Sequence, residues 1–338
     1  MIDLMKPKKL NKGDMIATVS PCWGISGNPD VLWKYKLGKT RLENMGLQVI
    51  SAPNSQKGEE YLRKNPQARA EDLLWAFENQ NVKAIIANIG GNDSEKVLPF
   101  LTAETIKCNP KILIGYSDVM NIHLFCYKAG LATFYGHNLL PTIAETPNFH
   151  PYSKKWFRKV LFDSDIIGEI EPSLEYSCDD NNYTDQNYAK NYKKDSGYLW
   201  IQGTGKVTGK LFGGHTGLKD FEGISEEDFE NTLLFVEDIS AFFAPYDLAG
   251  FLDWLGNIGA LQKICGMLIG KLCDDIPFDE HKKVMLKIIN EKYGLVDLPI
   301  AANMNFGHTS PMCILPYGAN AELDCDNKKF SISESGVV

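Results

Sequence analysis

Short apolar runs alternate with amphipathic stretches along the first half of the chain. The runs that predict strands are MIATVSP (15–21), LQVISAP (47–53), VKAIIANIGG (82–91), KILIGYS (111–117) and LATFYG (131–136). Helical spacing lies between them at 31–46 and at 65–80, where Asn65 is the candidate N-cap and Pro66 opens the helix. The run at 82–91 is too continuously apolar to have one face in water. This pattern predicts an α/β fold with a parallel sheet covered on both faces.

The pattern breaks in the middle of the chain and then resumes. EYSCDDNNYTDQNYAKNYKKDSGY (175–198) is polar, rich in Asn and Tyr, and without period, which is typical of a linker or a lid. Strands are then expected in KVTGKLFGG (206–214), TLLFVED (232–238), ICGMLIGKL (264–272) and IAANMNF (300–306), and helices at 247–259 and 280–294. We therefore predict an N-terminal domain (1–165), a linker or lid (166–200) and a second α/β domain (201–338).

Charge and hydropathy exclude several classes of partner. The chain has 338 residues and a formal net charge of −8, with no basic tract or stripe, so nucleic acid is not an expected partner. The first twenty residues lack the apolar core of a signal peptide. No run of about 18 apolar residues could span a membrane. The sequence thus predicts a cytoplasmic protein.

The eight cysteines show no metal-binding or disulfide spacing. None forms C-x-x-C, and most lie in apolar segments; they are Cys22, Cys108, Cys126, Cys178, Cys265, Cys273, Cys313 and Cys325. We expect them to be reduced and mostly buried, as in the cytosol, and we expect no zinc. CDDIPFDEH (273–281) gathers acids, a cysteine and a histidine, but we do not interpret it as a metal site. GTGKVTGKLFGG (203–214) satisfies neither glycine-rich nucleotide motif, so no cofactor is predicted.

Four short polar stretches follow predicted strands, where sites of open α/β sheets lie. They are NIGGNDS (88–94), GYSD (115–118), VEDIS (236–240) and NMNFGHTSP (303–311). Together they hold one complete catalytic set. Ser117 stands on a turn from strand to helix, and a serine needs an adjacent base to act as a nucleophile. His308 can be that base, and Glu237 can hold its tautomer.

Backbone N–H groups would have to stabilise the oxyanion in such a site. Asp118 N–H lies at the start of a predicted helix, and the Gly90–Gly91 pair lets a second backbone N–H approach. Each residue alone also has an ordinary structural interpretation. Ser117 could be a helix N-cap, and its turn departs from G-x-S-x-G at Val119. The glutamate could be salt-bridged, and the histidine could be a turn residue.

PKILIGYSDVMNIHLFCYKAGLATFYGHN resembles the nucleophile region of the LD-carboxypeptidase family of serine peptidases. The resemblance extends in order through IGGNDSEKVLPFL, GKLFGGHTGLKDFEG, LLFVEDIS and NMNFGHTSPMCILPYGANAELD. It implies a triad of Ser117, Glu237 and His308, with oxyanion donors on the backbone of Asp118 and Gly91. It also implies a Rossmann-like N-terminal domain, a smaller α/β C-terminal domain, an active site in the cleft between them, and a homodimer.

The family contains murein-tetrapeptide LD-carboxypeptidases and microcin C self-immunity proteins, and IGGNDS and FGHTSP look closer to the immunity branch. That branch cleaves an amide beside an acidic aminoacyl-adenylate. Candidate substrate contacts are Asn92, His215, Tyr183, Tyr188 and Trp200, with Tyr192 also available to stack a purine. A tyrosine-rich surface loop is the equal alternative for 175–200. Murein-tetrapeptide cleavage and a catalytically silent binding protein remain alternative functions.

Overall fold

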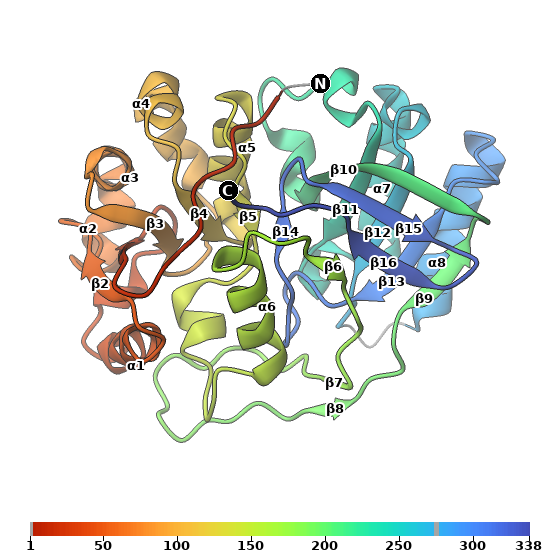
Figure 1. Ribbon diagram of the computed structural model, residues 1–338. Coiled ribbons are helices and arrows are strands. Elements are labelled where there is room, and N and C mark those ends of the chain that lie inside the picture. Colours follow the sequence, from red (N-terminus) through yellow and green to blue (C-terminus); the bar gives the residue numbers. More distant parts are fainter. Residues whose placement is uncertain (1–2, 274–276) are drawn as a thin grey trace.

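The computed structural model describes residues 3–273 and 277–338, which form two large sheets side by side and one small sheet of two strands (Figure 1). The N-terminal sheet has the order β14-β5-β4-β3-β1-β2. Strands β1 to β5 are parallel to one another, and β14 is antiparallel to β5. The strands are β1 (Met15–Val19), β2 (Gln48–Ser51), β3 (Val82–Ala87), β4 (Ile112–Gly115), β5 (Phe134–Tyr135) and β14 (Leu315–Pro316).

Alternate residues of the inner strands enter different hydrophobic clusters, so both faces of this sheet are buried. In β4, Ile112 and Ile114 belong to one cluster and Leu113 to the other. Helices provide the covering layers, as the continuous apolar runs predict. These helices are α1 (Leu32–Glu43), α2 (Glu59–Lys64), α3 (Pro66–Glu78), α4 (Ala103–Cys108), α5 (Met120–Lys128) and α6 (Pro151–Leu161).

The second sheet has the order β6-β16-β15-β10-β11-β12-β13-β9. Its four central strands are parallel, and antiparallel strands extend it on both sides. The strands are β6 (Gly168–Glu169), β9 (Leu199–Gln202), β10 (Lys206–His215), β11 (Thr232–Glu237), β12 (Gly266–Gly270), β13 (Ile300–Met304), β15 (Asn320–Asp324) and β16 (Lys329–Ile332). The described residues of this half form two α-helices, α7 (Pro245–Asn257) and α8 (Phe278–Leu286), and α8 continues as a π-helix (Lys287–Lys292).

The predicted α/β class is confirmed, and each predicted strand and helix has a counterpart in the structure. The pattern did not indicate the antiparallel strands β9, β15 and β16. Asn65 occupies the N-cap of α3 but makes no side-chain capping bond; its amide donates to the carbonyl of Tyr61 instead. No helix in the described part of the chain is long and apolar enough to cross a membrane.

Residues 175–200 run along the lower edge of Figure 1 and touch both halves of the molecule. The segment carries a small antiparallel pair, β7 (Glu175–Tyr176) and β8 (Lys193–Lys194). Lys34 Nζ donates to the carbonyl of Asn182 at 2.9 Å on the N-terminal side. On the other side Asp195 forms a 2.8 Å ion pair with Lys271, both side chains being 1% exposed. The predicted domain boundaries at 165 and 200 stay a prediction.

One cysteine prediction is wrong, because Cys178 and Cys273 form a disulfide. The two residues are 95 positions apart, and Cys178 lies in the polar segment that has no sequence pattern. Sequence spacing therefore gave no indication that the fold brings them together. The six other cysteines are free, and three of them, Cys22, Cys126 and Cys313, are buried.

A cross-link that closes so long a loop is expected to stabilise the fold appreciably. Replacing Cys178 by serine should lower the free energy of unfolding by about 2–4 kcal/mol under oxidising conditions, since the unfolded chain regains the freedom of that loop. Denaturant titration with and without a thiol reductant measures the difference. Cys108→Ser, which changes an exposed free cysteine, is the control. Equal stabilities of the oxidised and reduced wild type would contradict this expectation.

Candidate active site

The predicted catalytic residues come from the carboxyl ends of parallel strands in both sheets. Ser117 follows β4, Glu237 ends β11, and His308 follows β13. They meet beside a cavity of about 560 Å³ whose walls come from the two halves of the chain. Strand ends are where polar loops and helix N-termini converge in such sheets, so the topology itself gathers these side chains.

Ser117 stands on a sharp turn between β4 and a short 3-10 helix (Ser117–Val119) that leads into α5. Its φ of 66° lies in the left-handed region, where a residue with a side chain costs about 1–3 kcal/mol. The neighbouring loop approaches closely because Gly90 has no side chain. A Cβ at Gly90 would lie 2.7 Å from the Cβ of Ser117 and 2.8 Å from its Oγ. The turn and the glycine together leave the hydroxyl facing the cavity.

The three side chains form a continuous hydrogen-bonded chain. Ser117 Oγ lies 2.9 Å from His308 Nε2, and His308 Nδ1 lies 2.7 Å from Glu237 Oε2. The backbone N–H of His308 also donates to Glu237 Oε2, at 3.0 Å. An imidazole held in this way carries its proton on Nδ1 and offers Nε2 as an acceptor to the serine. The arrangement can therefore remove the Ser117 proton.

Tyr135 bonds to two of the predicted catalytic residues, a contact that the sequence did not indicate. It ends β5, is fully buried, donates its hydroxyl to Glu237 Oε1, and accepts the Ser117 N–H at 3.3 Å. One phenol thus links the nucleophile turn to the glutamate of the other sheet. A buried tyrosine needs a partner for its hydroxyl, but the sequence does not show which partner it meets.

The carboxylate and the imidazole shift one another's pKa. Burial alone would raise the pKa of Glu237, which is 2% exposed, but His308 and the bonds from His308 and Tyr135 hold it below its usual value. Burial alone would lower the pKa of His308, but Glu237 outweighs it and raises that pKa. The pair therefore favours an ionised glutamate and a basic imidazole.

This shift predicts the pH dependence of catalysis. Only neutral His308 can accept the serine proton, so kcat/KM should fall as the pH drops through its raised pKa, at an inflection above about 6.5. Glu237→Gln should move the inflection to lower pH, because the charge that raises the histidine pKa is gone. Rate profiles of both proteins measure this. An inflection that does not move would show that another group titrates.

The two residues predicted to supply oxyanion donors both reach the cavity. Gly91 and Asp118 line the same cavity as Ser117 and His308. Asp118 lies in the first turn of a helical segment, where N–H groups have no partner within the helix. A Cβ at Gly91 would lie 2.8 Å from the backbone nitrogen of Trp23, so only glycine fits. The predicted oxyanion donors are thus brought to the cavity together.

Comparison with known proteins places this chain in a family. The LD-carboxypeptidase N-terminal domain matches residues 16–136, and the LD-carboxypeptidase C-terminal domain matches residues 208–323. Over 328 residues the chain is 32% identical to the "Putative carboxypeptidase YocD" of Bacillus subtilis (strain 168), covering 95% of this chain and 96% of that protein. This chain belongs to the LD-carboxypeptidase family. It is therefore a serine-type carboxypeptidase, a hydrolase of peptide or amide bonds.

Two further relatives lie on the microcin side of the family. The chain is 29% identical over 302 residues to the microcin C7 self-immunity protein MccF of Escherichia coli, covering 87% of this chain and 86% of that protein. It also superposes on the crystal structure of an MccF-like protein from Streptococcus pneumoniae in complex with AMP. That match has a TM-score of 0.87 and 29% identity, and covers 95% of this chain and 99% of the other.

The candidate substrate contacts lie in several places in this LD-carboxypeptidase fold. Asn92 and His215 line the cavity at Ser117. Tyr183 and Tyr188 instead line a separate cavity of about 490 Å³ between the N-terminal half and the 175–200 segment. Trp200 lies in β9, where it pairs with Ala301 of β13. Tyr192 donates its hydroxyl to Glu145 at 2.5 Å. The structure thus brings only two of these candidates to the catalytic serine.

Several cavity residues were not indicated by the sequence. Aromatic side chains stand at the opening, with Phe242 and Tyr246 exposed by 61% and 86%. Carboxylates outnumber ammonium groups on the walls, since Lys219 is the one lysine among the described lining residues. The acids that line it, besides Asp118, are Glu95, Asp220, Asp238 and Asp247. Burial, and then the neighbouring Glu237, raises the pKa of Asp238. The described lining of the cavity is therefore rich in acidic side chains.

The described part of the chain contains no group of three or more His, Cys, Asp or Glu side chains that could hold a metal ion. Of the acidic stretch at 273–281, residues 274–276 lie outside the described residues. Cys273 is in the disulfide, and His281 is buried and bonds the carbonyl of Phe243 at 2.9 Å. Neither of these two side chains faces the cavity at Ser117.

Proposed function

We propose that this enzyme uses a Ser117–His308–Glu237 triad to hydrolyse the amide of an aminoacyl-nucleotide, as the MccF-type relatives suggest. The observation that carries the proposal is the unbroken chain from Ser117 Oγ through His308 to Glu237, at 2.9 and 2.7 Å. An adenine nucleotide is bound in the MccF-like relative from Streptococcus pneumoniae, which supports a nucleotide-bearing substrate.

The chemistry follows from the positions of the side chains. His308 Nε2 accepts the Ser117 proton as Oγ attacks the amide carbonyl, and the Glu237 carboxylate stabilises the imidazolium. The N–H groups of Gly91 and Asp118 bind the oxyanion of the tetrahedral intermediate. His308 then gives its proton to the leaving nitrogen, and the acyl group stays on Ser117 as an ester. Water, activated by the same imidazole, releases the acyl group as a carboxylate and restores Ser117.

The charges of the cavity support an aminoacyl substrate. A free aminoacyl group carries an α-ammonium group beside the scissile carbonyl, and carboxylates within several ångströms attract such a group. The walls supply them at Glu95, Asp220, Asp238 and Asp247. Acetylation of the α-amino group removes its charge and should therefore raise KM for an otherwise identical substrate.

A substrate panel tests the proposal. Purified enzyme and Ser117→Ala should be assayed by mass spectrometry on an aminoacyl-sulfamoyl adenosine, on its N-acetylated form, and on a murein tetrapeptide. We expect turnover of the free aminoacyl compound by the wild type alone, unchanged by a metal chelator. Turnover of the tetrapeptide alone would favour the murein activity that the family name also covers. No turnover of any amide would favour the silent binding protein. The predicted homodimer can be tested on the same samples by light scattering.

A further inference from the structure

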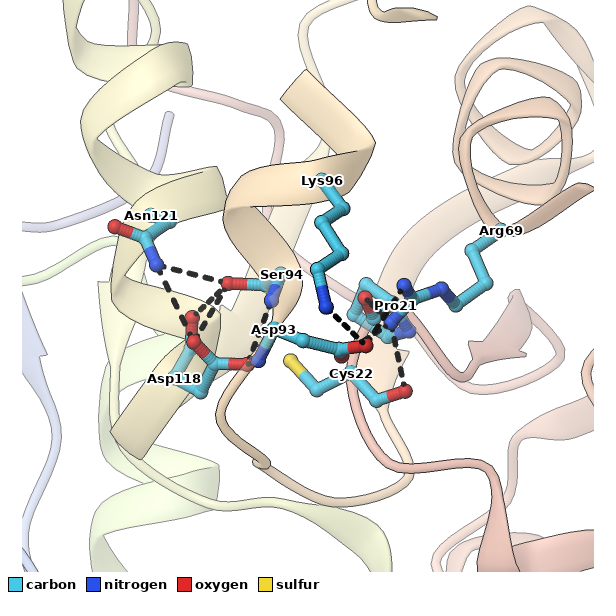
Figure 2. Close-up of polar contacts among 8 residues, drawn as sticks. All are labelled: Pro21, Cys22, Arg69, Asp93, Ser94, Lys96, Asp118 and Asn121. Carbon is cyan, nitrogen blue, oxygen red and sulfur yellow. Dashed lines mark hydrogen bonds and ion pairs between the residues drawn. The ribbon is translucent and has the colours of Figure 1, made fainter. Parts of the chain in front are cut away.

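Three loops that follow β1, β3 and β4 meet at one edge of the N-terminal sheet, and buried polar side chains join them (Figure 2). The loop after β3 contains Gly91, and the loop after β4 contains Ser117 and Asp118. The triad accounts for Ser117, and the oxyanion proposal uses only the backbone of Gly91 and Asp118. The side chains that surround this backbone have no role in either.

The Asp118 carboxylate, on a residue that is 6% exposed, receives four hydrogen bonds. Its Oδ2 accepts the backbone N–H groups of Asp93 at 3.0 Å and Ser94 at 2.9 Å. Its Oδ1 accepts Ser94 Oγ at 2.8 Å and Asn121 Nδ2 at 3.2 Å. An ionised carboxylate only accepts, so it suits a place where four donors converge. This carboxylate ties the loop after β3 to the turn that carries the nucleophile.

Arg69, on α3, ties the same loop to the one after β1. The residue is 1% exposed, and its guanidinium donates to the Pro21 carbonyl at 3.2 Å and to the Cys22 carbonyl at 3.1 Å. It also pairs with both oxygens of the Asp93 carboxylate, at 2.7 and 3.2 Å. A buried guanidinium is tolerated when it is paired and hydrogen-bonded in this way.

The glycines explain why these anchors are needed. Nothing but a glycine fits at Gly90, against Ser117, or at Gly91, against Cys22 and Trp23. The loop therefore has no side chain of its own at the point where it donates to the oxyanion. Before the glycines the loop is held at Asn88, whose backbone N–H donates to the Val19 carbonyl at 2.8 Å, and the Trp23 N–H donates to the Gly90 carbonyl at 3.0 Å. After the glycines its anchors come at Asp93 and Ser94.

We infer that the Asp118 carboxylate and the Arg69–Asp93 pair are positioning residues that fix the Gly91 N–H relative to the Asp118 N–H. The inference rests on the proposed function, since it assigns these side chains to the oxyanion site of that reaction. Oxyanion donors must stand within about 3 Å of the developing charge, and a misplacement of about 1 Å can cost about 100-fold in rate. The turn and the loop follow different strands, and the Asp118 carboxylate bonds the loop directly to the turn, so it can hold the two donors at a constant spacing.

Asp118→Asn tests the inference with little change of size. The carboxamide replaces one acceptor oxygen by an NH2 group, which cannot accept the hydrogen bonds of the loop after β3. That loop should therefore shift, while the backbone of residue 118 keeps its position. We expect kcat to fall about 10- to 100-fold, with KM within about 3-fold of the wild type. Asp93→Asn, which weakens the Arg69 pair from the loop side, should act in the same direction.

Binding of a transition-state analogue distinguishes a misplaced oxyanion site from a general loss of stability. Affinity for a boronic-acid analogue of the aminoacyl group should fall by the same factor as kcat. Binding of the uncleaved substrate, measured in a Ser117→Ala background, should stay within about 3-fold. Lys96→Ala is the matched control, because this exposed lysine pairs with the same Asp93 carboxylate at 3.7 Å but, in Figure 2, is bonded to neither Arg69 nor Asp118.

The outcomes distinguish this inference from the proposed function. An active wild type with an inactive Ser117→Ala keeps the proposed function, whatever Asp118→Asn does. Asp118→Asn with unchanged kcat, or with equal losses for the boronic acid and the uncleaved substrate, overturns the positioning role. A loss in Lys96→Ala as large as that in Asp93→Asn overturns it as well. A wild type without turnover or boronic-acid binding overturns both.

Discussion

Replacing Ser117 by alanine is expected to lower kcat by about 10⁴-fold or more, with the protein still folded. The hydroxyl is the one nucleophile bonded to His308 Nε2 in the described cavity, at 2.9 Å, and alanine removes the attacking atom without adding bulk. His308→Ala and Glu237→Ala should cause losses of a similar order. Because the three residues act as a unit, the double variants should be little worse than the singles. Steady-state rates and a thermal melt of each variant measure both points.

Glu237→Gln should lower kcat less than Ser117→Ala does, because a carboxamide can still accept the imidazole N–H. His150 and Glu175 supply a matched control, because they form another histidine–glutamate pair, at 3.1 Å, that does not line the cavity. His150→Ala should leave the rate within about 2-fold, as expected for a residue outside the catalytic unit. A Ser117→Ala protein with the wild-type rate would rule out the triad.

Local pattern was sufficient for the central strands and for the loops at their ends. Continuous apolar runs such as 82–91 and 111–117, placed between helical stretches, are typical of buried parallel strands, and polar residues just after such strands lie at one edge of the sheet. That is why Ser117, Glu237 and His308 could be proposed together from three distant stretches. The structure adds their distances, which no spacing along the chain contains.

What the sequence did not indicate depends on contacts between distant strands. In the sequence Tyr135 is one of several aromatic residues in predicted strands. Its hydrogen bond to Glu237 depends on how β5 and β11 are placed in the fold. Arg69 reads as a surface residue of an amphipathic helix, yet it is buried against Asp93. Cys178 lies in a segment without period, where no pattern predicts a partner 95 residues away.

The surface that the tyrosine-rich segment (175–200) covers could not be predicted from the sequence either. Its composition suggested stacking on a substrate, but composition does not tell which surface a loop covers. In the structure Tyr183 lies edge-on to Trp23, with ring centroids 6.3 Å apart, in the second cavity. Whether the segment acts as a lid stays a hypothesis. Single Ala changes at Tyr183 and Tyr188 test it on adenylate and tetrapeptide substrates.

Replacing Gly307 by alanine is expected to lower kcat by about 100-fold or more, although the residue itself does no chemistry. Gly307 precedes His308 and has a φ of +91°. A Cβ there would clash with the Glu237 carboxylate, lying 2.6 Å from its Cδ and Cγ. That carboxylate cannot move away freely, because Tyr135 and His308 hold its two oxygens. The methyl group must therefore displace Glu237 or His308, and the imidazole loses its alignment with Ser117.

Gly223→Ala separates this contact from backbone strain. Gly223 has nearly the same φ, +88°, but a Cβ there would meet nothing within 4 Å. Gly223→Ala should cost about 1–2 kcal/mol in unfolding free energy, the usual penalty of the left-handed region, and Gly307→Ala should cost more because of the added clash. Only Gly307→Ala should lose the rate. His308 imidazole signals in an NMR titration should also show a lower pKa in Gly307→Ala, since the distance from Glu237 has grown. Equal rates for the two variants would mean that the tight contact at Gly307 does not govern the triad.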